Sequence, residues 1–312
     1  MSDFKTNPLP VYIAPVQGHT DAAWRHFHHS TYGGDFRYYT PFIRCEHGEL
    51  RRQDLRDLLS PLNDGIDLEP QVIFRDMTEL DILLSRLKSE GMTRVNLNMG
   101  CPFPLQMGKG RGAGFLSNLD EASKLPDTLA KYPELSYSVK MRIGHDDNTE
   151  WRKIIEILNS LPLSEIAVHP RIGKQQYSGE LDLEMLAELM KVSRHKIIYN
   201  GELKTPADME RVTADWPDAA GLMVARGILG RPSLASEYSE GEEWSPEKRK
   251  AAMMDFHDKL LTHYEETLCG DSQILSKIKP FWEYAEAEIG RKTWKAIKKS
   301  STLAKYRTAI NN

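Results

Sequence analysis

Short apolar runs alternate with longer amphipathic segments from the start of the chain to about residue 230. Short runs rich in branched side chains and bounded by polar or turn-forming residues predict β-strands. Several runs are apolar at almost every position, which is typical of strands covered on both faces. The eight predicted strands are Val11–Ala14, Arg37–Ile43, Pro70–Phe74, Arg94–Asn98, Tyr137–Met141, Glu165–His169, Lys196–Asn200 and Gly221–Ala225.

The segments between the strands predict helices. Leu80, Leu83 and Leu87 recur at helical spacing within Thr78–Glu90. Similar patterns occupy Leu119–Tyr132, Trp151–Leu161, Leu181–Val192 and Pro206–Val212. Alternating strands and helices imply parallel pairing with right-handed crossovers. Eight repeats indicate an α/β fold of the (β/α)₈ TIM-barrel type, in which residues 48–68 fit no simple connection.

The pattern changes after about Pro232. The segment Glu237–Pro246 is acidic and contains Ser, Gly and Pro, so it predicts a linker. Three helical segments without strand signals follow, at Pro246–Leu268, Ser272–Ile289 and Lys292–Ile310. We therefore expect a catalytic barrel over residues 1–235, a linker over 236–245 and a small all-helical domain over 246–312.

Composition narrows the class of protein. Charged residues make up 28% and hydrophobic residues 40% of the chain, as in soluble globular proteins. No apolar run reaches the roughly 18 residues of a membrane span, and the first ten residues show no secretory signal. The three cysteines form no C-x-x-C pair and the histidines no metal-binding spacing, so we expect a cytoplasmic protein without a metal site. A net charge of −4 disfavours general polyanion binding but leaves room for a local basic surface.

Polar residues gather where the predicted strands end. In TIM barrels the active site is built at the carboxyl ends of the strands. The loops after the seventh and eighth strands commonly bind phosphate there, which suits Asn-Gly and Arg-Gly pairs. The residues at these ends are Ala14, Pro15, Val16, Gln71, Asn98, Lys140, Arg142, His169, Arg171, Asn200, Gly201, Glu202, Ala225 and Arg226.

Two of these positions, Lys140 and His169, have alternative interpretations. Lys140 either points to solvent at a strand end or stabilises the anionic edge of a reduced flavin. Gln71 and Asn98 could hydrogen-bond the polar edge of such a ring. His169 is either a structural histidine or, beside Arg171, a contact for phosphate or RNA.

Cys101 lies in the most distinctive loop, residues 100–114. Its five glycines and two prolines exclude a regular helix, and Lys109 and Arg111 make it basic. Such a loop can close over a substrate. A thiol with an ordinary pKa of about 8.5 is mostly protonated at neutral pH and can act as a general acid. The alternative is a cysteine buried as a small apolar residue.

Together these residues resemble the tRNA-dihydrouridine synthase family (bacterial Dus). The resemblance covers about residues 9–235 and extends loosely through the helical tail. Pro170, Ile172 and Phe103-Pro104 depart from the family pattern, which leaves open which uridine is reduced. The matching runs are Ala14-Pro15, Gln71, Leu97-Asn98-Met99-Gly100-Cys101-Pro102, Val139-Lys140-Met141-Arg142, Val168-His169-Pro170-Arg171, Gln175 with Tyr177, Asn200-Gly201-Glu202 and Arg226-Gly227.

The resemblance implies an FMN-dependent reductase that uses NADPH (or NADH) as a transient reductant. Hydride would pass from reduced FMN to C6 of a flipped-out uridine, expected in the tRNA D-loop, while Cys101 would protonate C5. The implied FMN-binding residues are Ala14, Pro15, Val16, Gln71, Lys140, His169, Asn200, Gly201, Glu202, Ala225 and Arg226. The implied substrate-binding residues are Asn98, Arg142, Arg171, Gln175, Tyr177, Lys109 and Arg111.

A basic tail fits an RNA substrate. The segment Arg291–Arg307 carries seven cations and no acidic residue. A uracil in stacked RNA must be flipped out to reach the mouth of the barrel. Binding of the RNA phosphates then needs cationic side chains outside the cavity. Among them we expect Arg291, Lys292, Lys295, Lys298 and Lys299 to contact tRNA. We expect no membrane partner and a monomer.

Two other functions remain open. One is an FMN-dependent barrel that reduces a small ene or pyrimidine compound, which would not need the basic tail. The other is an RNA-binding relative without catalysis, against which the presence of both Cys101 and Lys140 argues.

Overall fold

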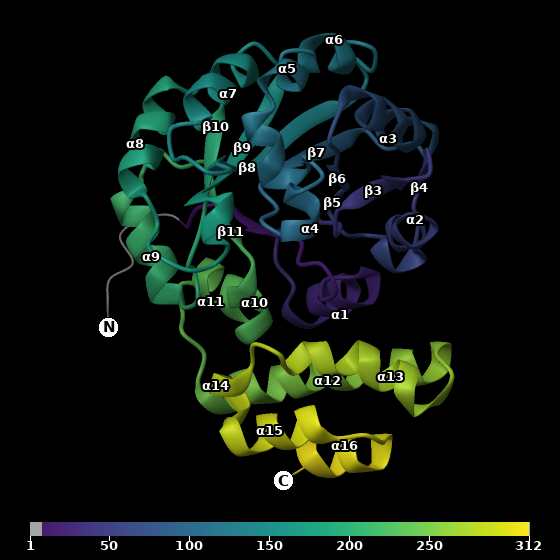
Figure 1. Ribbon diagram of the computed structural model, residues 1–312. Coiled ribbons are helices and arrows are strands. Elements are labelled where there is room, and N and C mark those ends of the chain that lie inside the picture. The colour runs from purple at the N-terminus through teal and green to yellow at the C-terminus, as the bar shows by residue number, and fades with distance from the viewer. Residues whose placement is uncertain (1–7, 312) are drawn as a thin grey trace.

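The strands of the computed structural model, which describes residues 8–311, curl into a closed barrel ringed by helices (Figure 1). All strand pairs of the barrel wall are parallel, and the first strand pairs with the last, so the predicted TIM barrel is confirmed. The expected absence of a targeting signal concerns residues that lie partly outside the described range. The uninterrupted strands are β1 Val11–Ile13, β7 Arg94–Met99, β8 Ser136–Gly144, β9 Leu163–Ile172, β10 Lys196–Asn200 and β11 Gly221–Val224.

The second and third strands of the barrel are each split in two. The prediction of one strand over Arg37–Ile43 is wrong, because the chain leaves the sheet at Pro41, which has no N–H for the ladder. Pro70 interrupts the third strand in the same way. The halves pair separately: β2 Arg37–Tyr39 with β5 Leu68–Glu69, and β3 Ile43–Glu46 with β6 Gln71–Ile73.

Residues 48–68, for which no simple connection was predicted, form a small excursion between these strands. It contains β4 Glu49–Leu50, which pairs antiparallel with β3, then the helix α2 Arg52–Leu58 and the 3₁₀ turn η1 Pro61–Asn63. Asn63 donates to the carbonyls of Asp57 and Leu58, so the excursion is fastened to itself.

Helices cover the outside of the barrel. In α3 Met77–Ser89 the predicted leucine stripe is buried, and Asp76 caps the first turn by accepting from the Glu79 N–H. The predicted helix over Leu119–Tyr132 is two short helices, broken at Ser123 and Lys124. The helices of this layer are α1 Ala22–Tyr32, α5 Leu119–Ala122, α6 Leu125–Leu129, α7 Trp151–Leu158, α8 Leu183–Val192, α9 Pro206–Asp215 and α10 Arg226–Gly230.

The predicted linker over 236–245 is a connection only in its second half. The helix α11 Leu234–Glu240 occupies the first half, where Glu237 is fully buried in an ion pair with Arg231. The acidic composition of this segment wrongly suggested an exposed linker, because the Glu237 carboxylate is buried against the Arg231 guanidinium.

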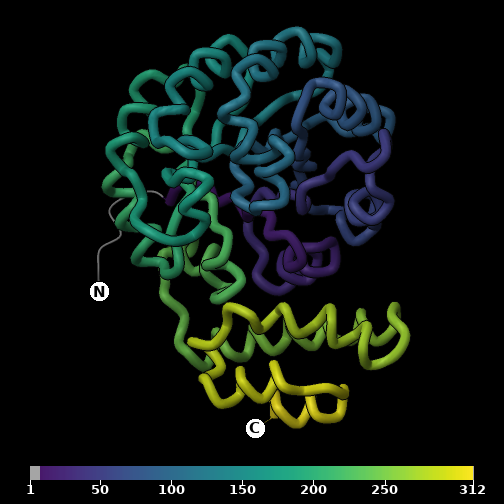
Figure 2. Tube along the Cα trace, in the orientation of Figure 1, coloured from purple at the N-terminus to yellow at the C-terminus, as the bar shows by residue number. Residues whose placement is uncertain are grey.

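The C-terminal helices form a separate layer beneath the barrel (Figure 2). The first predicted helix is confirmed, but Pro280 breaks the second and residues 300–302 break the third. Thr302 caps the last helix. These elements are α12 Pro246–Thr267, α13 Gly270–Ile278, η4 Lys279–Trp282, α14 Glu286–Ile289, α15 Arg291–Lys299 and α16 Leu303–Ile310.

One continuous hydrophobic core joins the barrel to these helices. Phe256 of α12 lies edge-on against Trp24 of α1, with ring centroids 5.6 Å apart, and also against Phe281 of η4 at 5.1 Å. At the edge of the contact Lys277 pairs with Asp21 at 2.8 Å. The helical layer is thus packed on the barrel rather than loosely tethered to it.

The inside of the barrel is divided into an apolar and a polar half. Most barrel interiors are filled by branched apolar side chains. Here one side holds the apolar cluster Ala14, Tyr39, Ala167, Ile198 and Met223. The other side holds the buried polar residues Glu69, Gln71, Asn96, Asn98 and Ser138.

Candidate active site

A cavity opens at the carboxyl ends of the barrel strands, where the polar strand ends were predicted to converge. All eleven residues expected to bind FMN line it. Cys101, Asn98, Arg142 and Tyr177 line it as well. Parallel strands point their ends to the same face, which explains how positions spread over more than 200 residues meet.

Cys101 is held at the cavity by its own backbone. The side-chain oxygen of Asn98, at the end of β7, accepts from the N–H groups of Gly100 at 3.0 Å and Cys101 at 2.9 Å. Gly112 packs beneath, where a Cβ would lie 2.6 Å from the Cys101 carbonyl oxygen. Its φ of +59° also favours glycine. Two separate segments thus fix the position of the thiol.

The Cys101 thiol is protonated at neutral pH. Burial raises its pKa above the ordinary value, although the nearby charges of Lys140 and Arg142 act in the opposite direction. The thiol can therefore donate a proton, and the same two cations favour the thiolate that remains.

Lys140 points into the barrel mouth, which excludes the interpretation that its side chain faces solvent at a strand end. Its Nζ donates to the Oδ1 of Asn200 at 2.8 Å. Burial, with a smaller contribution from Arg142, lowers its pKa to about 8. Burial and the charges of Arg142 and Lys140 also lower the pKa of His169, which is therefore neutral.

On the other side of the cavity, Glu202 forms ion pairs with three cationic side chains. Its carboxylate contacts Lys204 at 2.7 Å, Arg171 at 2.8 Å and Arg226 at 3.1 Å. Burial alone would raise its pKa, but the hydrogen bonds from Lys204 and Arg171 lower it to about 2. Glu202 also has a left-handed φ of 46°, a backbone conformation that is costly for a residue other than glycine and that clusters at functional sites.

The donor set of the cavity fits a phosphate-bearing flavin. Four cationic side chains line it against one carboxylate: Lys140, Arg142, Lys204, Arg226 and Glu202. This excess of positive charge favours phosphate and the anionic edge of a reduced flavin ring. The amides of Gln71 and Asn98 lie at the same cavity and suit the polar edge of the ring.

The loop of residues 100–114 is less open than predicted. It contains the short helix α4 Pro104–Met107 and the start of the 3₁₀ segment η2 Gly112–Ser117, whose first five residues are buried. Its exposed residues lie between 103 and 109, with Phe103 54% and Leu105 67% accessible. Any closing motion therefore belongs to that part of the loop.

Two of the predicted substrate contacts have other partners in the structure. The guanidinium of Arg111 is buried against Glu79, at 2.6 Å, and the Cys45 carbonyl, so the prediction that it binds RNA does not fit. Lys109, two residues earlier, is exposed. The side chain of Gln175 accepts from the Ile172 N–H at 2.8 Å and shapes its own loop.

Arg142 and Tyr177 lie at the mouth of the cavity. Arg142 is 1% exposed and donates to the carbonyls of Gly100, Ile172 and Gln176, so it ties together the loops after β7 and β9. Tyr177 is 53% exposed, and its ring centroid lies 4.3 Å from the Arg226 guanidinium and 5.5 Å from that of Arg142. This leaves a partly accessible aromatic ring next to two cations.

Several lining residues have no signal in the sequence. They are Gln17, Pro41, Phe42, Leu203, Lys204, Met223 and Tyr284. Tyr284 belongs to the C-terminal helical layer, and its ring lies 5.6 Å from that of His19. The neighbouring Glu283 contacts His19 Nε2 at 2.9 Å. The helical layer thus supplies part of the cavity wall.

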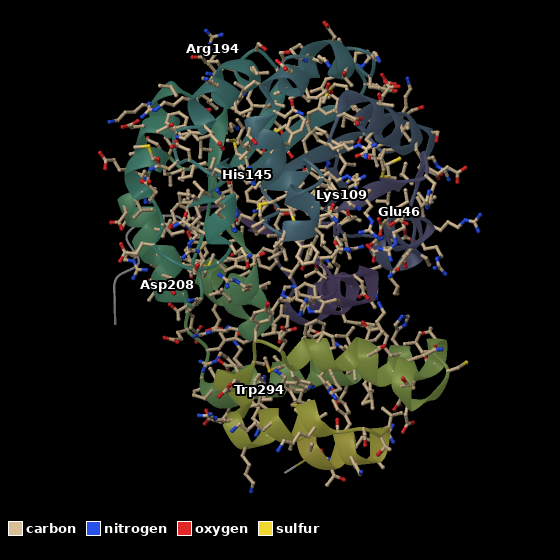
Figure 3. All side chains as sticks on the ribbon, in the orientation of Figure 1. Glu46, Lys109, His145, Arg194, Asp208 and Trp294 are labelled. Atoms are coloured by element: carbon tan, nitrogen blue, oxygen red, sulfur yellow. The ribbon has the colours of Figure 1, made fainter. Side chains whose placement is uncertain are left out.

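The predicted tail cations lie on one exposed helix, α15, of which only Ile297 is buried. Arg291, Lys292, Lys295, Lys298 and Lys299 are all exposed. The ammonium of Lys298 lies 4.0 Å from the ring of Trp294, which Figure 3 labels in the C-terminal helical layer. Arg307 pairs with Glu265 at 2.5 Å, so the seven cations are not all unopposed.

Among residues 8–311, no group of acidic, histidine and cysteine side chains is arranged to hold a metal ion. Within the same range no helix is long and apolar enough to cross a membrane.

Relatives with similar sequences extend over nearly the whole chain. A probable tRNA-dihydrouridine synthase of Rhodobacter capsulatus is 24% identical over 97% of this chain and 95% of its own length. One from Helicobacter pylori is 26% identical over 92% of this chain and 86% of its own. One from Staphylococcus epidermidis is 27% identical over 84% of this chain and 81% of its own.

Solved structures support the fold. Morphinone reductase in complex with tetrahydroNAD matches with a TM-score of 0.53 at 8% identity, over 75% of this chain and 87% of that one. The old yellow enzyme homologue from Zymomonas mobilis also matches with a TM-score of 0.53, at 9% identity over 75% and 89%. The model of the dihydrouridine synthase family matches residues 12–308, and this chain therefore belongs to that family.

Proposed function

We propose that the chain is an FMN-dependent tRNA-dihydrouridine synthase in which Cys101 is the proton donor. The observation that carries the proposal is a half-buried, protonated thiol in the same cavity as Lys140 and the amides of Gln71 and Asn98. The names of the relatives support tRNA as the substrate.

FMN, reduced by NADPH or NADH, would supply the hydride for C6 of the uracil ring. The Cys101 thiol gives its proton to C5, so the C5–C6 double bond gains one hydride and one proton and becomes a single bond. The thiolate that is left is stabilised by Lys140 and Arg142, whose charges lower the thiol pKa. Water then returns the proton.

The remaining residues of the cavity would hold the cofactor. Arg226 and the backbone at Gly201 suit the phosphate, because they follow the last two strands. Lys140 suits the anionic edge of the reduced ring, and Gln71 its hydrogen-bonding edge. Ala14 and Pro15, at the end of β1, have no side chain long enough to block a planar ring from the backbone.

The surface around the mouth suits an RNA substrate. A uridine must leave its stack to reach the thiol, and an exposed aromatic face such as that of Tyr177 can stack on a flipped base. Phe103 and Leu105 add exposed apolar surface on the neighbouring loop. The cations of α15 lie away from the cavity and would bind the phosphates of a folded tRNA.

Replacing Cys101 with alanine tests the proposed reaction. The variant should keep its yellow colour and its oxidation of NADPH but lose dihydrouridine formation at least 100-fold, on the order of a general-acid contribution. Mass spectrometry of the tRNA checks this, and Cys269→Ala is the matched control, because that cysteine is exposed and outside the cavity. Full activity of the Cys101 variant would remove the thiol from the mechanism.

The biological target is tested separately. RNA from a strain that lacks this gene should have lost dihydrouridine at one or more tRNA positions. A complete set of dihydrouridines in that strain would contradict a non-redundant role in tRNA.

A further inference from the structure

The polar half of the barrel interior is one unbroken series of side-chain hydrogen bonds, which we call the barrel ladder (Glu69, Ser138, Asn96, Gln71 and Asn98). It begins at the end of the barrel opposite the cavity. The Ser138 hydroxyl donates to Glu69 Oε1 at 2.5 Å, and Asn96 Nδ2 donates to the Ser138 oxygen at 2.6 Å. Gln71 Nε2 then donates to Asn96 Oδ1 at 2.8 Å.

The ladder ends at the backbone of the proton donor. Asn98 Nδ2 donates to Gln71 Oε1 at 2.6 Å, and its own Oδ1 accepts from the N–H groups of Gly100 and Cys101. Gln71 and Asn98 also line the cavity. The last two rungs thus belong both to the ladder and to the proposed active site.

In every hydrogen bond of the ladder, the donor lies on the side of the cavity and the acceptor on the side of Glu69. An ionised carboxylate only accepts hydrogen bonds, so Ser138 must donate to it and accept from Asn96. Each amide in turn must place its NH₂ toward Glu69 and its oxygen toward the cavity. An amide on its own has two nearly equivalent orientations. The charge at Glu69 and the backbone N–H groups of Gly100 and Cys101, which can only donate, both favour the same orientation of Gln71 and Asn98.

Burying the Glu69 carboxylate costs free energy, which a purely structural role would not require. Its side chain is 2% exposed, and burial raises its pKa to about 7. The nearest cation, Arg37, is 3.5 Å away and also binds Glu165 at 2.9 Å. The other charged or titratable groups that act on it are Arg94, Tyr12 and Tyr39.

We propose that Glu69 is a positioning residue for the cofactor and the proton donor, acting through the barrel ladder on the amides of Gln71 and Asn98. The proposal rests on FMN occupying the cavity, as argued above. It assigns to a residue at the closed end of the barrel an effect on flavin affinity and on the mobility of Cys101.

Glu69→Gln is the first test variant. A glutamine would turn its carbonyl oxygen to the Arg37 guanidinium and its NH₂ to Ser138, which reverses the first bond. Because the backbone N–H groups at the far end can only donate, one rung must then face two donors or two acceptors. The loss of about one charge-assisted hydrogen bond predicts a roughly tenfold rise in the FMN Kd.

Ser138→Ala breaks the ladder at the next rung without touching the charge, and should have the same effect. The double variant should be no worse than the more affected single variant, because both act on one pathway. The matched control is Glu165→Gln, which removes a carboxylate that binds the same Arg37 guanidinium from outside the ladder. Its FMN Kd should stay within about twofold of wild type, whereas a purely structural role for charge near Arg37 would affect both glutamate variants.

A second measurement needs no flavin. In the apo-protein, Glu69→Gln and Ser138→Ala should speed alkylation of Cys101 by iodoacetamide severalfold, because Asn98 holds its backbone less firmly. The exposed Cys269 of the same chain serves as the internal reference. Peptide mass spectrometry resolves the two sites, and thermal unfolding confirms that each variant is folded.

The pH profile separates positioning from structure. The ratio of the FMN Kd of Glu69→Gln to that of wild type should fall toward one as the pH drops from 8 to 6. Protonated Glu69 can donate as well as accept, so wild type then resembles the variant. Titration of the FMN phosphate cancels in this ratio.

The outcomes are distinguishable. If wild type binds FMN but Glu69→Gln matches Glu165→Gln in Kd and in Cys101 alkylation, the positioning role is overturned while the proposed function stands. A ratio independent of pH would likewise overturn it. A wild-type protein that binds no FMN would overturn both.

Discussion

At the scale of single residues, the environment decides what Cys101 can do. Its neighbours act in opposite directions: burial keeps the proton on sulfur, and Lys140 and Arg142 make its departure easier. A thiol that stays protonated until a partner takes the proton is suited to donation rather than to nucleophilic attack.

Alkylation kinetics test this balance. Cys101 should react with iodoacetamide slowly at pH 7 and rapidly only above about pH 9, because the thiolate is the reactive form. Lys140→Met should slow the reaction further, since it removes a charge that lowers the thiol pKa. A rate for Cys101 in the variant equal to or above that of wild type would contradict the assigned influence of Lys140.

Glu69 should reduce the stability of the fold at high pH. Its folded pKa of about 7 lies above the ordinary value of 4.5, so the folded state binds the proton more tightly. Its stabilising contribution is fully present below about pH 4.5 and is lost as the pH rises through 7.

Urea unfolding at several pH values measures this effect. Between pH 5 and pH 8, the stability of Glu69→Gln relative to wild type should rise by roughly 3 kcal/mol. If the free energy of unfolding of Glu69→Gln and of wild type changed with pH in the same way over this range, burial of Glu69 would not be the dominant influence on its pKa.

At the scale of elements, the strands were predictable because burial on both faces leaves a nearly continuous apolar run, as at Gly221–Val224. The break in the second strand has a local signal in Pro41, which excludes a central strand position. The site could be predicted from strand ends, because topology alone brings them together.

Other features depend on contacts that the local pattern does not contain. The sequence around Arg111 predicts a surface cation, but its guanidinium is buried in an ion pair with Glu79, which lies 32 residues earlier. Tyr284 joins the cavity only because the helical layer packs against α1. The barrel ladder is likewise invisible in the sequence, where its five members are scattered polar residues on strands.

The helix α15 carries the prediction that belongs to this scale. Replacing Lys295, Lys298 and Lys299 with glutamine should weaken tRNA binding and lower the salt slope of log K by about 2 to 3, since each phosphate contact contributes about 0.9. Flavin reduction by NADPH should be unchanged.

Fluorescence anisotropy at several salt concentrations provides the measurement. The control replaces Lys88 and Lys131, which pair with Glu134 and Asp81 on the barrel wall. If the tRNA affinity and the salt slope of the α15 variant equalled those of wild type, α15 would have no role in RNA binding.

At the scale of the whole molecule, the barrel and the helical layer share one hydrophobic core. Aromatic contacts of Phe256 reach both Trp24 in the barrel layer and Phe281 in the tail. Cooperative unfolding is expected where a core is continuous, so the two parts should unfold together.

Calorimetry of Phe256→Ala tests the shared core. The variant should lose about 3 to 5 kcal/mol of stability, as large core truncations do, and its single transition should move to lower temperature as a whole. Val192→Ala, at a position 51% exposed, should shift it little. Two separate transitions in wild type would refute the idea of one cooperative unit.

The contribution of Tyr284 to the cavity wall has a consequence for protein engineering. The barrel and the helical layer are not interchangeable modules, because one completes the pocket of the other. A chimera that joins this barrel to the helices of a relative would have to carry over Tyr284, and the Glu283 that holds His19, to preserve the shape of the pocket. Altering RNA preference by exchanging whole tails would therefore also alter the pocket.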